Sequence, residues 1–168
     1  MTVALPTLRA TASLARRIAR SLRGRDVVLL SGELGAGKTT LVRYLAEALG
    51  IEPGWVSSPS FTLVQRYPPG RAGVAVTHVD LYRLRGAAGL EALGLEEVLA
   101  GDDLVVVEWP GAADALWGPS GRPIWRLDLR TGPGGREAEV LEPGAGSGKQ
   151  GVESEKRSIR PAGRPKKS

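Results

Sequence analysis

Cysteine is absent from this chain of 168 residues, and aromatic side chains make up only 5% of it. Without cysteine, the chain cannot form disulfide bonds, ligate zinc through thiolates or use a thiol nucleophile. The same absence suits a protein of the cytoplasm, where thiols are kept reduced, and we expect that location. No apolar run approaches the roughly 18 residues of a membrane helix, and the arginine-rich N-terminus lacks the apolar core of a secretory signal.

An excess of basic residues gives a net charge of +5, and most of this excess lies near the C-terminus. Residues 142–168 contain seven Lys or Arg and three Glu, which leaves about +1 for residues 1–141. Gly, Pro, Ser and charged residues dominate this C-terminal stretch, a composition typical of disorder. We therefore predict one folded domain over 1–141 and a disordered basic tail over 142–168. The composition predicts no basic groove on the folded part.

Helical and strand-like segments alternate along the folded part, which predicts an α/β domain. The first predicted helix covers 12–23, with Thr11 as its N-cap. A second helix is expected at 38–49, and a third at 89–100 with an interruption at Gly94. Predicted strands are 26–31, 60–67, 74–80, 103–109, 124–130 and 136–141, with one hairpin formed by the second and third and another by the last two.

One stretch, GELGAGKT, matches the phosphate-binding motif G-x-x-x-x-G-K-[ST] in full. It follows an apolar strand and precedes a helix, which is the context this loop requires. Its glycines let backbone N–H groups turn toward an anion, and the helix N-terminus adds partial positive charge. Lys38 is predicted to reach the β- and γ-phosphates, and the Thr39 hydroxyl to ligate Mg²⁺. The predicted nucleotide-binding residues of this stretch are Gly32, Glu33, Leu34, Gly35, Ala36, Gly37, Lys38, Thr39 and Thr40.

A phosphate-binding loop needs an acidic residue near the metal, usually at the end of a second buried strand. Glu108 ends the apolar run LVVV and is predicted to bind the metal or position water, with a solvated strand end as the alternative. Asp80 ends another apolar strand and is predicted to orient water or bind metal through water, with a helix N-cap as the alternative. His78, the only histidine, is expected to be structural rather than catalytic.

Asparagine is also absent from the chain. The chain therefore cannot contain N-K-x-D, with which many P-loop GTPases recognise guanine, and ATP is the expected nucleotide. The sequence shows no lid domain or acceptor pocket that would mark a small-molecule kinase.

Six motifs occur in the order SGELGAGKTT, SSPSFTLVQRY, HVDLYRL, LGLEEVL, VVVEWP and GREAEV. With this set, which spans about residues 5–141, the chain resembles the TsaE family (formerly YjeE), ATPases of bacterial tRNA threonylcarbamoyladenosine synthesis. The combination of SPSFTLV, HVDLYRL and VEWP is far more specific than the phosphate-binding loop alone. One departure is Ser60, where the family often has Thr; the hydroxyl is kept, and ATP-dependent behaviour is expected to survive.

The resemblance implies a small P-loop NTPase-like domain with a mixed, mainly parallel sheet flanked by helices. It implies an ATPase that supports addition of a threonylcarbamoyl group to N6 of the adenosine next to the anticodon, in tRNAs reading codons that begin with A. The protein would not catalyse the transfer. It would bind the TsaD and TsaB proteins and regulate or reset their complex by binding and hydrolysing ATP, contacting tRNA indirectly through that complex.

The resemblance also assigns roles to individual residues. Thr39 and Glu108 would serve Mg²⁺, and Asp80 would lie near the γ-phosphate, so that either Asp80 or Glu108 positions water while Lys38 neutralises phosphate charge. The segment with Ser58, Ser60 and Thr62 would be sensitive to the nucleotide. Thr11, Trp109 and Arg136 are further predicted nucleotide-binding residues, with a core aromatic as the alternative for Trp109.

Three other interpretations are open from the sequence. A small-molecule or protein kinase would give a phosphorylated product, whereas an ATPase gives free phosphate. A pure binding module would hold ATP without turnover. A nucleic-acid protein acting through its tail would lose function on truncation after about Leu141, whereas a tail without function would not matter. Arg83 is a candidate arginine finger, although an exposed or ion-paired arginine is the favoured interpretation.

Overall fold

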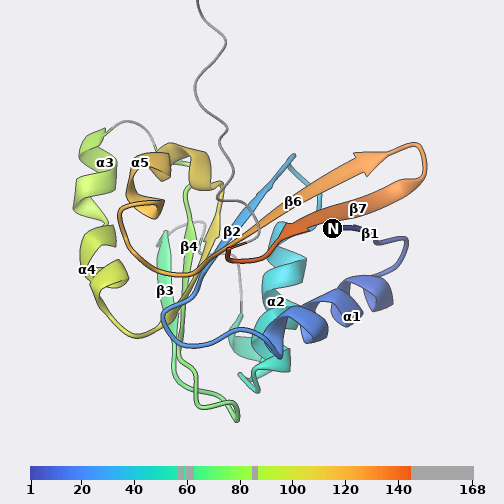
Figure 1. Ribbon diagram of the computed structural model, residues 1–168, viewed down its shortest axis with the longest axis horizontal. Coiled ribbons are helices and arrows are strands. Elements are labelled where there is room, and N and C mark those ends of the chain that lie inside the picture. The colour runs from blue at the N-terminus through green and yellow to red at the C-terminus, as the bar shows by residue number, and fades with distance from the viewer. Residues whose placement is uncertain (57–58, 60–62, 85–86, 145–168) are drawn as a thin grey trace, which may run out of the picture.

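The computed structural model describes residues 1–56, 59, 63–84 and 87–144. In this part of the chain, seven strands form one sheet in the order β1-β7-β6-β2-β5-β4-β3 (Figure 1). The strands are β1 (Thr2–Ala4), β2 (Val27–Gly32), β3 (Val64–Tyr67), β4 (Val76–Asp80), β5 (Leu104–Glu108), β6 (Ile124–Gly132) and β7 (Gly135–Leu141).

The four central strands β6, β2, β5 and β4 are parallel, and the antiparallel pairs lie toward the two edges. The mixed, mainly parallel sheet predicted from the resemblance is therefore confirmed. Both predicted hairpins are present, as β3–β4 and β6–β7. The short edge strand β1 was not predicted; it is only three residues long and is held by pairing with β7.

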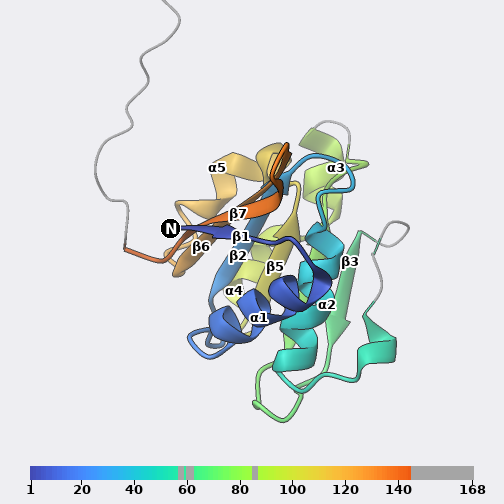
Figure 2. The same cartoon turned by 90° about the vertical axis from the view of Figure 1, so that its right-hand side faces the viewer.

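Helices cover both faces of the sheet. In Figure 2, α1 (Leu8–Ala19) and α2 (Lys38–Ala48) lie in front of the sheet, and one apolar core forms beneath them. On the opposite face, α3 (Ala87–Ala92), α4 (Leu95–Ala100) and α5 (Asp114–Trp117) enclose a second core around the buried Trp117 (Figure 1). Alternate residues of the central strands belong to the two cores, since successive side chains of a strand point to opposite faces of the sheet.

The first helix begins four residues earlier than predicted. Its N-cap is Thr7, whose hydroxyl accepts a hydrogen bond from the Ala10 amide, and not Thr11. Thr11 lies one turn inside the helix, where its hydroxyl donates to the Thr7 carbonyl. The sequence offers two threonines four residues apart, and the apolar periodicity alone did not distinguish them. The predicted interruption at Gly94 is confirmed, because this residue separates α3 from α4 with φ = 59°.

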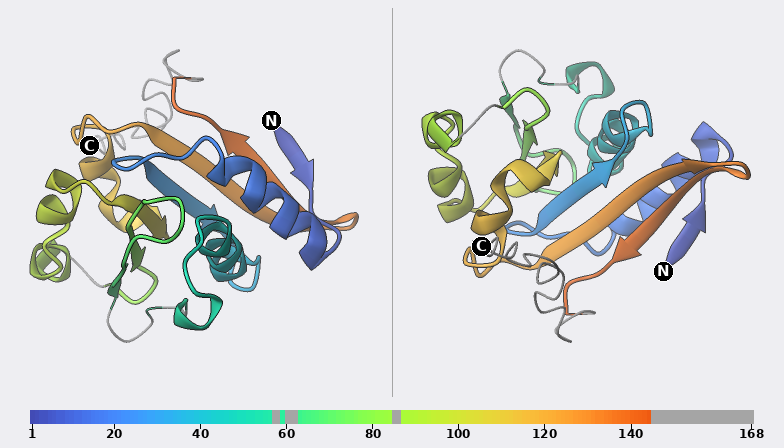
Figure 3. Two further views of the ribbon diagram at one scale, coloured as in Figure 1. Left: turned by 90° about the horizontal axis from the view of Figure 1, so that it is seen from below. Right: turned by 90° about the horizontal axis from the view of Figure 1, so that it is seen from above.

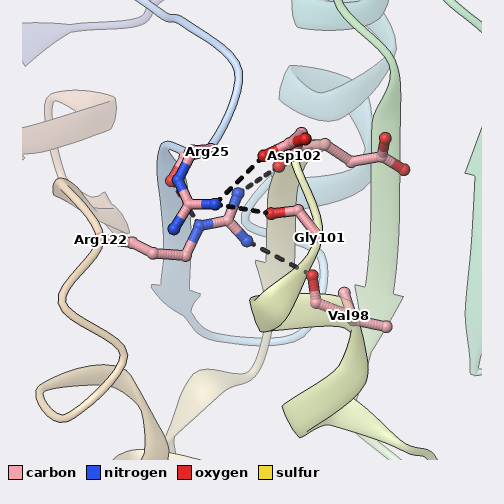
Figure 4. Close-up of polar contacts among 6 residues, drawn as sticks. Arg25, Val98, Gly101, Asp102 and Arg122 are labelled. Atoms are coloured by element: carbon pink, nitrogen blue, oxygen red, sulfur yellow. Dashed lines mark hydrogen bonds and ion pairs between the residues drawn. The ribbon is translucent and has the colours of Figure 1, made fainter.

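The buried side chain of Arg122 binds three backbone segments at the end of the sheet where β2 and β5 begin. The Arg122 guanidinium donates hydrogen bonds to the backbone carbonyls of Arg25, Val98 and Asp103 (Figure 4). Burial lowers the pKa of Arg122 below the ordinary arginine value, and the positive charge of Arg25 lowers it further. Nearby, Arg25 forms an exposed ion pair with Asp102 at 3.1 Å.

No helix in the described part of the chain has the length and apolar character needed to cross a membrane. Two short 3₁₀ turns, Pro53–Trp55 and Pro110–Ala113, complete the elements. The predicted tail from residue 145 onward and the predicted nucleotide-sensitive residues Ser58, Ser60 and Thr62 lie outside the described residues.

Candidate functional site

The phosphate-binding loop connects the central strand β2 to the start of α2. Three of its glycines have positive φ: Gly32 (132°), Gly35 (82°) and Gly37 (103°). At Gly32 a side chain is also sterically excluded, because a Cβ there would collide with the carbonyl oxygen of Leu129 on β6. The loop conformation therefore depends on glycine at these positions, and it brings the chain to the N-terminus of α2, where free backbone N–H groups can receive an anion.

Lys38 is buried and folded back over the loop. Its Nζ donates to the carbonyl oxygens of Gly32 and Glu33, each at 2.8 Å, and lies 3.7 Å from the centre of the Trp109 ring. Burial lowers the pKa of this ammonium, while the charges of Glu108 and Asp80 act in the opposite direction. The cation is thus held beside the loop by weak neutral partners, in a place where phosphate oxygens would be stronger ones.

Glu108 links the loop helix to the sheet. Its Oε2 accepts a hydrogen bond from the Thr39 hydroxyl at 3.0 Å, and its Oε1 lies 3.0 Å from Nε2 of His78. Glu108 and His78 are both almost completely buried, at 2% and 0% exposed. A carboxylate buried in this way needs hydrogen-bond donors, and these two side chains supply one to each oxygen.

The hydrogen bonding of His78 also indicates its tautomer. Nε2 must carry the proton to donate to Glu108, and Nδ1 is buried without a partner among the described residues. A bare lone pair costs less in such a place than an unpaired N–H, so a hydrogen on Nε2 and none on Nδ1 fits this geometry best. The expectation of a structural histidine is refined: this one orients Glu108.

Asp80 lies in the same row of the sheet as Glu108, since the two residues pair directly across β4 and β5. It is 7% exposed, and its Oδ1 accepts from the backbone N–H of Tyr82 at 3.0 Å. A carboxylate that accepts from the backbone N–H two residues later resembles the helix N-cap given as the alternative for Asp80. The described residues 81–84 form a turn, however, and not a helix. Because β4 and β5 are parallel, their carboxyl ends bring both acids to the edge of the sheet where the loop lies.

These groups surround one pocket of about 350 Å³. Its walls are the loop and start of α2, the ends of β4 and β5, and the residues just beyond those strands. The lining residues are Leu34, Gly35, Gly37, Lys38, Thr39, Thr40, Leu63, Asp80, Tyr82, Arg83, Glu108 and Trp109. The arrangement combines backbone donors, one ammonium and two carboxylates, which is suited to a polyphosphate with a divalent cation.

The donor set fits Mg²⁺ in the way that nucleotide-dependent sites usually do. No group of three or more His, Asp or Glu side chains in the described residues forms a metal cage. The Thr39 hydroxyl and the Glu108 carboxylate are hard oxygen donors 3.0 Å apart. Magnesium commonly takes one or two protein oxygens and completes its shell with phosphates and water.

A comparison with known proteins agrees with this geometry. The family model described as "Threonylcarbamoyl adenosine biosynthesis protein TsaE" matches residues 5–136. The chain belongs to the TsaE family. A Streptomyces coelicolor protein named tRNA threonylcarbamoyladenosine biosynthesis protein TsaE is 50% identical over 97 residues, which cover 57% of this chain and 64% of that relative. A Mycobacterium tuberculosis protein of the same name is 42% identical over 123 residues, covering 68% of this chain and 72% of its own length.

A solved structure supports the fold. The crystal structure of Bacillus subtilis YdiB superposes with a TM-score of 0.64 and 26% identity, covering 86% of this chain and 84% of that one. The P-loop NTPase-like fold expected for a TsaE protein is therefore confirmed, together with the recognition of the family from its motifs.

Most of the residues predicted for the site meet in the TsaE pocket. Lys38, Thr39, Asp80, Glu108 and Trp109 all line it. Trp109 packs against the second core, as its alternative interpretation described, and its ring faces Lys38 from a left-handed backbone (φ = 60°). Its nucleotide-binding role stays a prediction.

Five of the predicted residues that the structure describes lie outside that lining. Three belong to the phosphate-binding loop itself (Gly32, Glu33 and Ala36), and the other two are Arg136 and Thr11. Arg136 on β7 places its guanidinium 3.3 Å from the point where a Cβ of Gly37 would lie, so it borders the loop from behind. Thr11 is buried inside α1 and is not among the pocket residues, and its nucleotide-binding role stays a prediction.

Sequence reasoning missed two pocket residues, Leu63 and Tyr82. The Leu63 carbonyl accepts from the Asp80 amide at 2.9 Å, and the Tyr82 ring packs on Trp109 with centroids 4.9 Å apart. Tyr82 stands two residues after the acid in HVDLYRL, which is a usable signal. Leu63 lies in SPSFTLV, the segment that the resemblance makes sensitive to the nucleotide, although the residue itself was not named; it reaches the pocket immediately before β3, which pairs with β4.

Proposed function

We propose that this TsaE protein is an ATPase that supports formation of threonylcarbamoyladenosine in tRNA. The observation that carries this proposal is the continuous chain of contacts from the phosphate-binding loop through Thr39 to Glu108 and His78, with Asp80 in the same pocket. A buried, oriented carboxylate beside the loop hydroxyl is the arrangement expected of a site that holds Mg²⁺ and positions water.

Each residue has a distinct task in this proposal. The backbone N–H groups of the loop bind the phosphates, and Lys38 exchanges its carbonyl partners at Gly32 and Glu33 for phosphate oxygens. Thr39 and Glu108 hold Mg²⁺, which when bound stabilises charge on the β- and γ-phosphates. The water that attacks the γ-phosphate is oriented by Asp80 or Glu108, whose carboxylates lie in one row of the sheet.

The role in tRNA modification follows from the names of the relatives and from the resemblance. The protein would bind the TsaD and TsaB proteins in the cytoplasm and use ATP binding and hydrolysis to regulate or reset their complex, reaching tRNA through that complex. A slow intrinsic turnover suits such a switch. Arg83 lines the pocket and is a candidate for the residue that completes the site when the partners are bound.

Phosphate release from Mg²⁺–ATP, measured with and without TsaB, TsaD and tRNA, tests the proposal. We expect release to be stimulated by the complex and abolished in Glu108→Ala, with ATP binding partly retained. Glu96→Ala, at an exposed position of α4 remote from the pocket lining, is the matched control and should behave as wild type. Wild-type turnover in Glu108→Ala would refute the assignment of this carboxylate.

The same assay separates the rival functions. A phosphorylated acceptor in place of free phosphate would identify a kinase, and tight ATP binding without release even with partners would identify a binding module. Loss of stimulation after removal of residues 145–168 would assign the function to the tail.

A further inference from the structure

Most of the exposed residues of α1 and its C-cap are arginines. After the exposed Leu8 at the helix start, they are Arg9, Ser13, Arg16, Arg17 and the C-cap Arg20, which recur at helical spacing. The same helix buries Leu14, Ile18 and four smaller residues against the sheet. The arginines therefore lie on the opposite, solvent-exposed side of the helix. We call Arg9, Arg16, Arg17 and Arg20 the arginine face. Figure 2 shows α1 as the outermost layer on its side of the sheet.

These cations are not neutralised by ion pairs. In the described part of the chain, ion pairs hold Arg25, Arg66 and Arg130, and none involves a member of the arginine face. Residues 1–25 contain no Asp or Glu at all, and the next acid, Asp26, is buried and accepts from the Arg23 amide.

The acids of the neighbouring strands point away from α1. In β6 and β7, Leu127, Leu129, Ala138 and Val140 belong to the core beneath α1. Asp128, Glu137 and Glu139 alternate with these residues and therefore lie on the opposite face, where Arg130 pairs with two of them. From α2, Glu47 is exposed and is the one acid of that helix. Although the net charge of the domain is nearly balanced, positive charges gather on the exposed side of α1, away from the acids of β6 and β7.

The arginine face also borders two hollows. One, of about 500 Å³, lies between α1 and β1, and the other, of about 540 Å³, lies between α1 and the end of α2. Arg16 and Arg20 line both of them. Figure 3 shows α1 running alongside β1 over the β6–β7 end of the sheet. At about 1.5 Å per residue, the face extends roughly 16 Å from Arg9 to Arg20, enough to follow several phosphates.

We propose that the arginine face binds the sugar-phosphate backbone of RNA. Guanidinium groups pair with phosphates through two parallel hydrogen bonds, and a cluster without acids is suited to a polyanion more than to a mixed protein surface. The four arginines are accompanied by Ser13 and no aromatic residue, so they would position RNA without reading its bases. That the RNA is a tRNA rests on the proposed function.

Binding of fluorescently labelled tRNA to the full chain, followed by anisotropy over a series of salt concentrations without ATP or partners, tests the proposal. The triple variant Arg16→Gln/Arg17→Gln/Arg20→Gln keeps the helix propensity and removes three charges. We expect weaker binding and a slope of log K against log salt that is smaller by about two to three. The tail contributes equally to wild type and variant, so the difference between them isolates α1.

The matched control is Arg66→Gln/Arg126→Gln/Arg130→Gln, which removes the same charge from exposed positions on other elements. It should lower the slope far less. Equal slopes in wild type and the α1 variant, or an equal loss in the control, would overturn the proposal. Unchanged RNA binding with lost binding of the TsaB–TsaD complex would assign the face to a protein partner. Basal phosphate release, measured on the same variant, reports separately on the ATPase proposal and should not change.

Discussion

Glu108 connects the helix that follows the phosphate-binding loop to the central sheet. One of its oxygens accepts from Thr39 on α2 and the other from His78 on β4, so the carboxylate spans the space between the loop helix and the sheet. Because both oxygens are occupied, the side chain has little freedom to rotate. An acid oriented in this way can serve a metal or a water without reorganising when the nucleotide binds.

His78 should control the use of Mg²⁺ rather than the capacity to bind nucleotide. We expect His78→Val to raise the Mg²⁺ concentration for half-maximal phosphate release by about tenfold or more, as loss of a hydrogen bond to a metal ligand usually does. His78→Gln keeps an N–H donor and should recover part of the difference. Affinity for ATP without Mg²⁺ should stay close to wild type in both variants. An unchanged Mg²⁺ dependence in His78→Val would contradict the orienting role.

Lys38 should make stability depend on pH in the nucleotide-free protein. Burial lowers the pKa of its ammonium from the ordinary value of 10.5, so the unfolded chain keeps this proton to higher pH than the folded chain. The free energy of unfolding should therefore rise with pH across the window between the lowered pKa and 10.5. Urea unfolding at several pH values should show this rise in wild type. The same rise in Lys38→Met, which should also lose ATP binding, would assign it to another group.

At the scale of elements, the connections matter as much as the helices and strands. The three carbonyls bound by Arg122 belong to the segment before β2, to α4 and to the residue before β5. Because β2 and β5 carry the loop and Glu108 at their far ends, this arginine helps to fix the relative position of the two strands that build the site.

Removal of the Arg122 side chain should destabilise the fold without touching the pocket. We expect Arg122→Ala to lower the free energy of unfolding by about 3 kcal/mol, because three backbone carbonyls lose a charged donor and a buried side chain is removed. Arg25→Ala, which removes only an exposed ion pair and its neighbouring contact, should cost less than about 1 kcal/mol. Denaturant unfolding of the two variants measures the difference, and equal losses would contradict the assignment.

At the scale of the whole molecule, the pocket and the N-terminal helix lie on different parts of the sheet. The pocket with the phosphate-binding loop lies at the carboxyl ends of β2, β4 and β5, whereas β1 and β7 form the edge of the sheet near α1. The N-terminal amine and carbonyl of Met1 bond to Val140, so β1 closes the edge of β7. The arginine face lies near this edge. Together, the two proposals assign one surface of the molecule to a nucleotide and another to a polyanion.

Several features could be predicted from the amino-acid sequence alone: the phosphate-binding loop, the acids at the ends of two apolar strands, both hairpins and the family. These features are local, because a motif, a period or a turn is written in neighbouring residues. The N-cap was predicted at Thr11 instead of Thr7, since both threonines suit the position and helix boundaries depend on local geometry. The strand β1 was missed because three residues carry no periodic signal.

Which side chains contact one another could be seen only in the folded molecule. The hydrogen bond between His78 and Glu108 joins residues 30 positions apart, and the place of Leu63 in the pocket depends on strand pairing. Overall charge predicted no basic surface on the domain, yet the burial of one side of α1 forces its arginines onto the other. The contact of His78 with Glu108 and the place of Leu63 arise from strand order, which brings distant residues together. The arginine face follows from helical spacing within α1, but overall charge does not reveal it.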